Sequence, residues 1–385
     1  MVMRQNFLPY NQPDIGDEEI RAVTQVLRSG WLTRGPVTQQ FEQTLQDLLE
    51  VPYVVAVSSC TAALHLALVL HNVGPGDEVV TTPMTFVASI NAILETGATP
   101  VLVDINPVTG NINLDAAKAA INEKTRAILP VHYGGLPVDM AALIALRDRY
   151  GLAIIEDAAH ALGARYEGRN IGSFGNVACF SFYATKNITT GEGGALSLTD
   201  PDLVQKARTM SLHGLSRQAW NRYSSGGTWA YDVTMLGFKY NMTDIQAALG
   251  LTQLARLGDM QKKRRALAFR YHEKLSRLPL KLPTEPSFTD HAWHLYAVRL
   301  DRNKTSARRN TVIQDLARHA IGTSVHFIPV YRFTYYQDRF GWRPEDFPMT
   351  EAFYETELSL PLYPSMTIQD VDDVAQALAT SLTGG

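Results

Sequence analysis

The stretch VAVSSCTAALHLAL (55–68) decides the fold that we expect for this chain. It begins in a β-rich apolar run, YVVAV (53–57), passes through a polar Ser-Ser-Cys-Thr turn and ends in a stretch with helical composition. A strand that leads at once into a helix is a building unit of α/β proteins. The same turn offers free backbone N–H groups at a helix N-terminus, where anions bind. A Ser/Thr helix cap without a ligand is the alternative interpretation.

The alternation of strands and helices continues through the first two thirds of the chain. Further strand-like runs are EVVTT (78–82), PVLV (100–103), AILPV (127–131), AIIED (153–157) and CFSFY (179–183). Continuous apolar strands separated by helical stretches predict an α/β fold, with a mainly parallel central sheet and helices on both faces. Because ligands of such sheets gather at the carboxyl ends of the strands, residues that directly follow a strand are the candidates for chemistry.

The chain is long enough, at 385 residues, for two hydrophobic cores. We expect a large domain over residues 1–250 and a small C-terminal α+β domain over 251–385, joined by a helix from Thr243 to about Leu278. The other expected features are a helix capped by Asp115, a long loop at 216–229, strands at HLYAVRL (294–300) and TSVHF (323–327), and a helix from about Ile368.

Composition narrows the class of protein. The net charge is −3 and 45% of residues are hydrophobic, so no general nucleic-acid or membrane-surface role is indicated. The two cysteines, Cys60 and Cys179, argue against a disulfide scaffold, and neither has a partner at metal-ligand spacing. The N-terminus lacks a signal-peptide core, and the longest apolar stretches are too short to cross a bilayer. We therefore expect a cytoplasmic protein.

The segment IIEDAAHALGARY (154–166) places an acid at the end of a buried strand. Asp157, in that position, could hold a cationic ring nitrogen and keep it protonated. The alternative is a helix N-cap, because Ala-Ala-His-Ala follows.

The segment CFSFYATKNITTGEGGAL (179–196) places Lys186 on a loop that follows another buried strand. A lysine walled by apolar residues has a lowered pKa and can form a Schiff base, whereas a solvated loop lysine is the alternative. Ser181 could donate to a phosphate, or simply bond to the backbone. Together with the turn at 58–61, these segments offer an anion cradle, an acid for a ring nitrogen and an amine, the three attachments that pyridoxal phosphate requires.

At this point the chain resembles the DegT/DnrJ/EryC1/StrS family of pyridoxal-phosphate-dependent sugar aminotransferases over nearly its whole length. The motifs that carry the resemblance are SGWLTRGP (29–36), SSCTAALHLAL (58–68), TPMTFVASINAI (82–93), PVHYGG (130–135), EDAAHALGARYEGRNIGSFG (156–175), CFSFYATKNITTGEGGAL (179–196), LHG (212–214), LGFKYNMTDIQAALGLTQL (236–254), HAWHLY (291–296), VHFIPV (325–330) and LSLPLYPSMT (358–367). The resemblance implies a fold-type I transferase.

The resemblance also implies a role for individual residues. Lys186 matches the lysine that binds the cofactor covalently and later moves a proton, and Asp157 matches the carboxylate paired with the pyridine nitrogen. His160 matches a position beside the phenolic oxygen of the cofactor, and Phe86 an aromatic ring against its face. The implied phosphate cradle consists of Cys60, Thr61 and Ser181, with Asn241 reaching in from a neighbouring subunit of a homodimer.

Two positions depart from the family pattern. Many relatives have Asn-Gly-Thr where this chain has Ser-Cys-Thr, so Cys60 lacks the conformational freedom of glycine. Many also have His or Pro around 183–184, where this chain has Tyr183-Ala184. These two residues are expected near the sugar and bear on the substrate more than on the chemistry.

The motif set is similar to that of enzymes that aminate C4 of nucleotide-linked 4-keto sugars, with UDP favoured over GDP or dTDP and L-glutamate as the amino donor. Two alternatives within the resemblance are amination at C3 or of a cyclitol ketone, and a non-catalytic regulator that binds pyridoxal phosphate. A nicotinamide-dependent oxidoreductase is disfavoured, because the chain lacks the G-x-G-x-x-G fingerprint after its first strand. Lys186 argues against the family branch that performs dehydration, which has histidine there.

Overall fold

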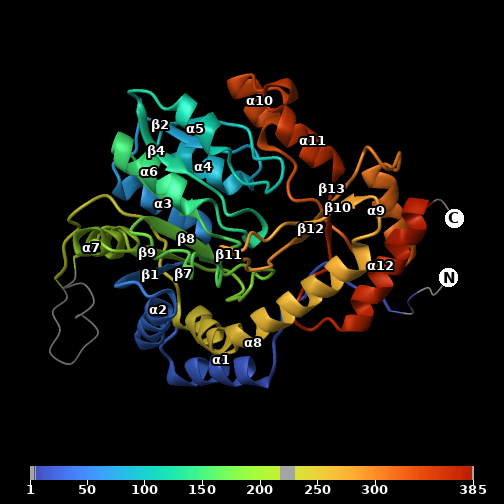
Figure 1. Cartoon of the computed structure of the whole chain (residues 1–385). Helices are drawn as coiled ribbons and strands as arrows, with labels where there is room; N and C mark the ends of the chain where they lie inside the picture. Colours follow the sequence, from blue (N-terminus) through green and yellow to red (C-terminus); the bar gives the residue numbers. More distant parts are fainter. Residues whose placement is uncertain (1–3, 5, 217–229, 384–385) are drawn as a thin grey trace.

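The structure is a computed structural model that describes residues 4, 6–216 and 230–383 (Figure 1). Its α-helices are α1 Asp17–Ser29, α2 Pro36–Leu49, α3 Cys60–Leu70, α4 Val87–Glu95, α5 Leu114–Ala120, α6 Met140–Tyr150, α7 Pro201–Met210, α8 Asp244–Leu275, α9 Arg309–Arg318, α10 Thr334–Phe340, α11 Pro348–Thr356 and α12 Ile368–Thr383. Its strands are β1 Tyr53–Val57, β2 Glu78–Thr81, β3 Thr99–Leu102, β4 Thr125–Leu129, β5 Ala153–Asp157, β6 Arg165–Tyr166, β7 Arg169–Asn170, β8 Val177–Ser181, β9 Gly194–Leu198, β10 Leu280–Lys281, β11 Thr289–Asp290, β12 Tyr296–Leu300 and β13 Glu357–Leu360.

The central sheet has seven strands in the order β1-β9-β8-β5-β4-β2-β3. Strands β8, β5, β4, β2 and β3 run parallel, whereas β9 is antiparallel to both of its neighbours, β1 and β8. The expected mainly parallel α/β sheet is therefore confirmed. Since β9 alone runs the other way, β1 points in the same direction as the parallel strands, and its carboxyl end lies at the same edge as theirs.

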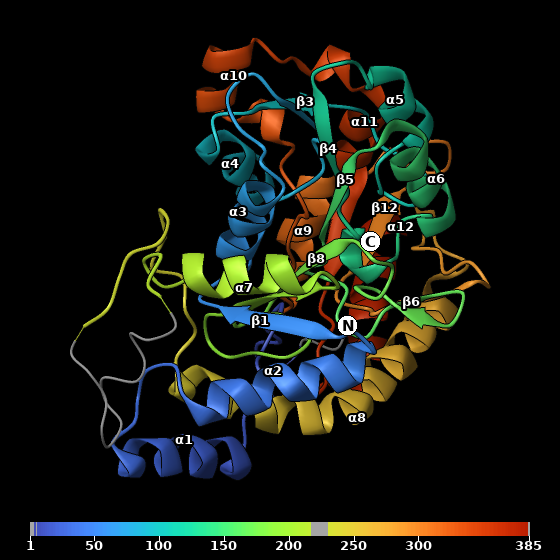
Figure 2. The same ribbon diagram turned by 90° about the vertical axis from the view of Figure 1, so that its left-hand side faces the viewer.

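Helices cover both faces of this sheet, as the unbroken apolar strands predicted (Figure 2). Neighbouring strand residues alternate between two cores: Val54 and Ala56 pack on one side with α2, α6 and α8, and Val55 and Val57 pack on the other with α3, α4 and α7. Because its strands are packed on both faces, the sheet is a rigid support. The residues at its carboxyl edge are therefore held in defined positions.

A second, smaller core lies in the C-terminal part of the chain. There the antiparallel sheet β10-β12-β13 packs with α9, α12 and the second half of α8. Helix α8 has 32 residues and touches both parts of the molecule, packing on α1 and α2 near its start and on α12 near its end (Figure 1). It crosses residue 250 without interruption, so the proposed boundary between 1–250 and 251–385 stays a prediction.

Several local expectations need correction. TSVHF (323–327) is not a strand, because only Ser324 forms a bridge, to Ser359, and the following residues turn toward a cavity. Helix α5 is capped by Asn113, whose side chain accepts the N–H groups of Asp115 and Ala116, so Asp115 is not the cap. In the C-terminal sheet, β12 begins at Tyr296 and not at residue 294.

Other expectations held or fall outside the structure. The long helix begins after Thr243, whose side chain caps it, and the final helix begins at Ile368. Apart from residue 216, the loop expected at 216–229 lies outside the described residues. Within the part of the chain that the structure describes, we find no helix with the length and apolarity needed to cross a membrane.

Candidate active site

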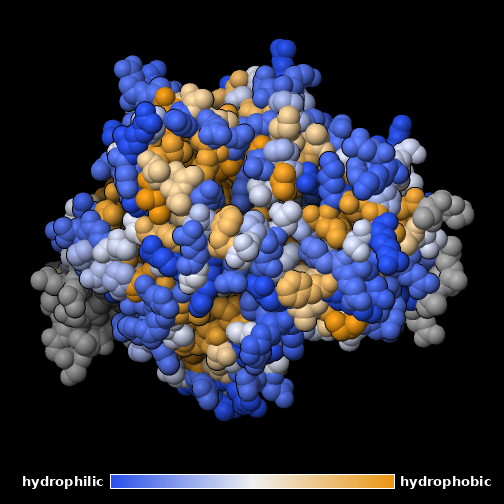
Figure 3. All heavy atoms as spheres, in the orientation of Figure 1, coloured by the Kyte–Doolittle hydropathy of each residue, from blue (hydrophilic) through white to orange (hydrophobic). Residues whose placement is uncertain are grey.

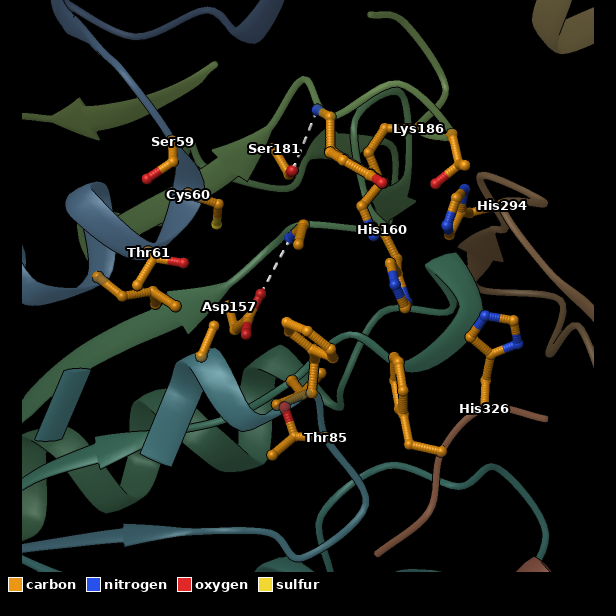
Figure 4. Close-up of a pocket in the computed structure, with 18 of the residues that line it drawn as sticks. Ser59, Cys60, Thr61, Thr85, Asp157, His160, Ser181, Lys186, His294 and His326 are labelled. Atoms are coloured by element: carbon orange, nitrogen blue, oxygen red, sulfur yellow. Dashed lines mark hydrogen bonds between the residues drawn. The ribbon is translucent and has the colours of Figure 1, made fainter. Parts of the chain in front are cut away.

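All but one of the expected site residues line one cavity of about 490 Å³ at the carboxyl edge of the central sheet (Figure 4). Three strands position most of these residues: β1 leads to the turn before α3, β5 ends at Asp157 and β8 ends at Ser181. The cavity is lined by seven of the residues singled out from the sequence, which are Cys60, Thr61, Phe86, Asp157, His160, Ser181 and Lys186. These residues are far apart in the sequence and meet because their strands are neighbours.

The N-terminus of α3 forms one end of the cavity. Ser59 is the N-cap, and its hydroxyl accepts the N–H of Ala62 at 3.0 Å. Cys60 and Thr61 belong to the first helical turn, where N–H groups have no partner within the helix. These N–H groups, the hydroxyls of Thr61 and Ser181 and the positive end of the helix dipole make this end suited to a phosphate. The helix-cap interpretation also holds, because Ser59 caps the helix while the next two residues face the cavity.

Gly194 allows the turn at Ser59 to sit against the sheet. It begins β9, opposite Val57 and Ser181 in register. A Cβ added there would lie 2.4 Å from the carbonyl carbon of Ser59 and 2.6 Å from the nitrogen of Cys60, distances that no side chain tolerates. Gly194, the last glycine of the TTGEGG run (189–194), is thus required by the close approach of two backbones.

Asp157 lies between this end and the lysine, with its carboxylate buried. Its Oδ2 accepts the Ser89 hydroxyl at 2.7 Å, its Oδ1 accepts the Ala159 N–H at 3.1 Å, and Thr85 bonds to Ser89 at 2.7 Å. No ion pair to this carboxylate is formed within the described residues, and burial raises the pKa of Asp157 despite these hydrogen bonds. The residues between Asp157 and β6 form turns and no helix, so the N-cap interpretation is wrong. A buried carboxylate without a cation fits a protonated ring nitrogen.

The neighbouring acid, Glu156, faces away from the cavity. Its carboxylate bonds to His132 at 3.0 Å and to Asn176 at 3.0 Å, and it is fully buried. Alternation along β5 therefore decides which of the two acids is available for chemistry.

Lys186 enters the cavity from the loop between β8 and β9. The backbone turns there, with the Lys186 N–H donating to the Tyr183 carbonyl at 2.9 Å. Burial lowers the pKa of Lys186 to about 8, while Asp157 and Cys60 oppose that shift. The amine is therefore not a solvated loop lysine, and a larger fraction of it is uncharged near neutral pH than in an exposed lysine.

His160 is buried beside the lysine. Its Nδ1 accepts the Gly134 N–H at 3.3 Å, so the neutral ring carries its proton on Nε2. Burial, with Lys186 adding to it, holds the pKa of His160 well below its usual range, so the ring stays neutral. His160 stacks on Phe327 with ring centroids 5.7 Å apart, and Phe86 lies 6.2 Å from the same ring.

The cavity residues that were not singled out from the sequence as site residues include His294, His326 and Tyr10. His294 lies 4.4 Å from His160, ring to ring, and its Nδ1 bonds to the side-chain Oδ1 of Asn187 at 3.1 Å. The motifs HAWHLY and VHFIPV contain the two histidines and could have identified them, whereas no motif includes Tyr10. Figure 4 shows His326 at the end of the cavity away from Ser59 and Cys60.

Asn241 does not line this cavity. Its backbone bridges Val57, and its side chain contacts the Lys239 amine and donates to the Met242 carbonyl at 3.3 Å. The role expected for Asn241 concerned a neighbouring subunit, so its position within one chain leaves that role a prediction.

Comparison with known proteins agrees with this geometry. The sequence model of the DegT/DnrJ/EryC1/StrS aminotransferase family matches residues 13–379. The chain is 50% identical, over 100% of both chains, to the spore coat polysaccharide biosynthesis protein SpsC of Bacillus subtilis.

Among solved structures, the chain is similar to the putative sugar aminotransferase Spr1654 from Streptococcus pneumoniae. In its PMP form the TM-score is 0.92 at 34% identity, with 97% of this chain and 98% of that chain covered, and in its PLP form the TM-score is 0.91. A second similar structure is PseC of Helicobacter pylori, an aminotransferase involved in the biosynthesis of pseudoaminic acid, with TM-score 0.91 at 30% identity and coverage of 99% and 100%.

These matches cover the chain almost from end to end, and the cavity offers the Lys186 amine, a buried carboxylate and a helix N-terminus for the cofactor of such enzymes. The chain therefore belongs to the DegT/DnrJ/EryC1/StrS aminotransferase family and is a pyridoxal-phosphate-dependent sugar aminotransferase.

Proposed function

We propose that this enzyme transfers the amino group of L-glutamate to C4 of a nucleotide-linked 4-keto sugar, with a UDP-sugar favoured, and releases 2-oxoglutarate. The observation that carries the proposal is the single cavity in which Lys186, Asp157 and the N-terminus of α3 face one another. The similarity to a polysaccharide biosynthesis protein supports a sugar as the acceptor. The position C4 rests on the motifs SGWLTRGP, HAWHLY and LSLPLYPSMT.

Lys186 is the proposed catalytic base. When bound, pyridoxal phosphate supplies an electron sink for the negative charge that develops on the substrate carbon. The lysine amine holds the cofactor before substrate arrives and then moves the proton at the reacting carbon. Its pKa of about 8 suits both tasks, because the amine accepts and releases a proton near neutral pH.

Asp157 is proposed to hold the ring nitrogen of the cofactor in its protonated form. Ser89 and the Ala159 N–H orient the carboxylate before any ligand binds. A cationic partner would stabilise the ionised carboxylate, which burial alone disfavours.

Other residues are assigned to the rest of the cofactor. His160 is placed to donate its Nε2 proton to the phenolic oxygen, and Phe86 is placed to cover one face of the ring. The phosphate is assigned to the N–H groups of Cys60 and Thr61 and to the hydroxyls of Thr61 and Ser181.

The absorption spectrum of the purified protein tests the donor half of this proposal. We expect a band near ~420 nm that moves toward ~330 nm when L-glutamate is added, because the amino group passes to the cofactor. Lys186→Ala should lack turnover, and borohydride treatment of the wild type should label Lys186. Glutamate that leaves the band in place would contradict the choice of donor.

The acceptor half is tested on the glutamate-treated enzyme. Addition of a UDP-, GDP- or dTDP-linked 4-keto sugar should restore the original band, fastest with the correct nucleotide, and the product should carry its new amine at C4. A product aminated at C3, or a response only to a cyclitol ketone, would favour the alternative substrates of the family.

We also propose that the enzyme is a homodimer with shared active sites. Large apolar side chains are exposed on α1, where Ile20 is 60% exposed, and on the segment before α8, where Leu236 is 81% exposed. Figure 3 shows several hydrophobic patches on this face, one of them near the start of α8. Exposed apolar side chains of this size favour a protein interface. The position of Asn241 outside its own cavity fits a role in a partner's site.

Mixing two inactive variants tests the shared site. In a mixed dimer of Lys186→Ala and Asn241→Ala chains, one site would combine an intact Lys186 from one chain with an intact Asn241 from the other. We expect each variant alone to have little activity and the mixture, after subunit exchange, to regain a part of it. A mixture with no more activity than its components, or a monomer by light scattering, would contradict the shared site.

A further inference from the structure

A chain of hydrogen bonds leads from the active-site cavity to a carboxylate with no contact with solvent. His326 lines the cavity, and its Nδ1 lies 2.9 Å from the Ser359 hydroxyl. That hydroxyl lies 2.5 Å from Glu357 Oε1, and Glu357 Oε2 accepts the backbone N–H of His326 at 2.9 Å. Glu357 is 0% exposed, and its hydrogen-bonded route to the cavity runs through Ser359 and His326.

Ser359 is the junction of this chain. A hydroxyl has one proton to donate and two lone pairs that accept. Two side chains bond to the Ser359 hydroxyl, namely Glu357 and His326. Because the hydroxyl has a single proton, Ser359 can donate to only one of these two side chains at a time. The other side chain must then donate a proton to a lone pair of Ser359.

The charge of Glu357 decides which of the two donates. An ionised Glu357 accepts the Ser359 proton, so a lone pair of Ser359 accepts a proton from His326 Nδ1, and His326 Nε2 is a lone pair. A protonated Glu357 donates to Ser359 instead, so Ser359 donates to His326 Nδ1, and His326 Nε2 carries the proton. In both states every group is satisfied, which is the condition for a buried polar network to be stable.

The far nitrogen of His326 is open to the cavity. In the described part of the chain, the buried side-chain polar atoms that lack partners are Arg208 Nε, Arg264 Nε and Trp293 Nε1. His326 Nε2 is not among these atoms, and it accepts or donates no hydrogen bond within the described residues, so its free side faces the cavity.

We propose that Glu357 is a positioning residue that acts through Ser359 to set whether His326 presents an N–H group or a lone pair to the substrate. The proton balance is complete: on ionisation the Glu357 proton moves to Ser359, the Ser359 proton moves to His326 Nδ1, and the Nε2 proton leaves through the cavity. The buried acid thus exchanges its proton with solvent without any movement of the backbone.

The surroundings of Glu357 place this exchange near neutral pH. Burial raises the pKa of Glu357 to about 8, although Ser359, the His326 N–H and Arg309 of α9 favour the ionised form. The other charged or titratable groups near the carboxylate are Tyr10 from the N-terminal segment, Tyr133, whose hydroxyl donates to the His326 carbonyl at 2.6 Å, and Arg299, which pairs with Glu357 in register on β12.

On the cavity side, His326 faces Lys186, His160 and His294. Burial, with Lys186 adding to it, lowers the pKa of His326 to about 3. The ring therefore stays neutral near neutral pH, and only the position of its proton changes.

The consequence for the reaction rests on the proposed function. Below the pKa of Glu357, His326 offers an N–H group that suits a carbonyl or ring oxygen of the sugar. Above that pKa it offers a lone pair that suits a sugar hydroxyl. A site with fixed hydrogen-bond polarity discriminates strongly between such groups, so Glu357 would tune which keto sugar is accepted.

Nitrogen NMR of the holoenzyme, labelled with ¹⁵N-histidine, tests the relay without any substrate. The two neutral tautomers have distinct ¹⁵N shifts, and the His326 signal is identified by its loss in His326→Asn. We expect the proton of His326 to move from Nε2 to Nδ1 as the pH rises through about 8, the pKa of Glu357. A tautomer that stays constant over this range in the wild type would overturn the proposal.

Three variants sharpen the test. Glu357→Gln mimics the protonated acid, because its amide donates to Ser359 and its carbonyl accepts the His326 N–H, and it should keep the proton on Nε2 at every pH. Ser359→Ala removes the junction and should also abolish the pH dependence, which covers the case in which the first variant does not fold. Glu355→Gln, on an exposed residue of α11, should behave as the wild type. A switch that survives in Glu357→Gln would overturn the relay.

The kinetic readout uses UDP-4-keto-6-deoxyglucose as the acceptor. Loss of one hydrogen bond corresponds to a change of about fivefold to tenfold in KM. We expect the KM of the wild type to change by that factor across the pKa of Glu357, and the KM of Glu357→Gln to stay at the low-pH value. An enzyme that shows the NMR switch but aminates no keto sugar would remove the proposed function and leave the relay standing. An enzyme that aminates the keto sugar but shows no NMR switch would overturn the relay alone and leave the proposed function standing.

Discussion

Ser89 lies within the motif TPMTFVASINAI, where no role was predicted for it, yet it holds the carboxylate at the centre of the site. It is the third residue of α4 and donates to Asp157 Oδ2 at 2.7 Å. Ser89→Ala should destabilise the ionised carboxylate by about 1.5–3 kcal/mol, the usual value for a hydrogen bond to a charged group. We expect the dissociation constant of pyridoxal phosphate to rise about tenfold or more, measured by titration of the 420 nm band.

Ser276→Ala is the matched control for this change, because Ser276 is exposed at the end of α8 and bonds only to the Glu273 carbonyl. It should bind the cofactor as the wild type does. Equal cofactor affinity in the Ser89 and Ser276 variants would mean that the Ala159 N–H alone is sufficient to orient Asp157.

At the scale of elements, the site depends on how closely β9 approaches the turn before α3. Gly194→Ala places a methyl group 2.4 Å from the Ser59 carbonyl carbon, and neither backbone can move without disturbing the strands beside it. The turn must then shift away from β9 and misplace the N–H groups of Cys60 and Thr61. We expect a large loss of cofactor affinity, seen as a colourless protein after dialysis, together with a lower melting temperature.

Gly258→Ala provides the contrast within α8. A Cβ at Gly258 meets nothing within 4 Å, so the change should stabilise the helix by about 0.5–1 kcal/mol and leave cofactor binding intact. If Gly194→Ala also bound the cofactor normally, the phosphate would not lie at this turn.

At the scale of the whole molecule, histidines that the fold buries in the neutral form make stability depend on pH. Burial, with Arg265 and His272 adding to it, lowers the pKa of His291 to about 3, and its Nδ1 accepts the Trp293 N–H at 2.8 Å. As the pH falls from about 6.5, the unfolded chain binds this proton before the folded chain does. Stability is therefore full above that pH and falls by up to about 1.4 kcal/mol per pH unit for this histidine.

Urea denaturation at several pH values measures this slope. His291→Asn keeps an acceptor for the Trp293 N–H but does not titrate, so its stability should fall less steeply below pH about 6.5 than that of the wild type. His213→Asn is the control, because His213 is exposed and asparagine tolerates its φ of 59°. Parallel pH slopes for the wild type and His291→Asn would show that other groups dominate acid unfolding.

The sequence by itself determined the features that short segments encode. Unbroken apolar runs predict buried strands of a mainly parallel sheet, because period and composition are local properties. The order of the motifs predicts the family, and a strand end predicts where Asp157 and Ser181 lie. The prediction that Asp115 caps α5 was wrong, because Asn113 and Asp115 are both good caps and only the path of the chain selects Asn113.

The tertiary structure alone decided which groups meet. Ser89 and Asp157 are 68 residues apart, Gly194 touches the turn at Ser59, and His326 reaches Glu357 through Ser359, 33 residues away. These contacts depend on strand order and on the packing of the C-terminal part against the large sheet, which no local pattern encodes. The burial that lowers the pKa of Lys186 has the same origin, because a low dielectric is created by residues from the whole chain surrounding one amine.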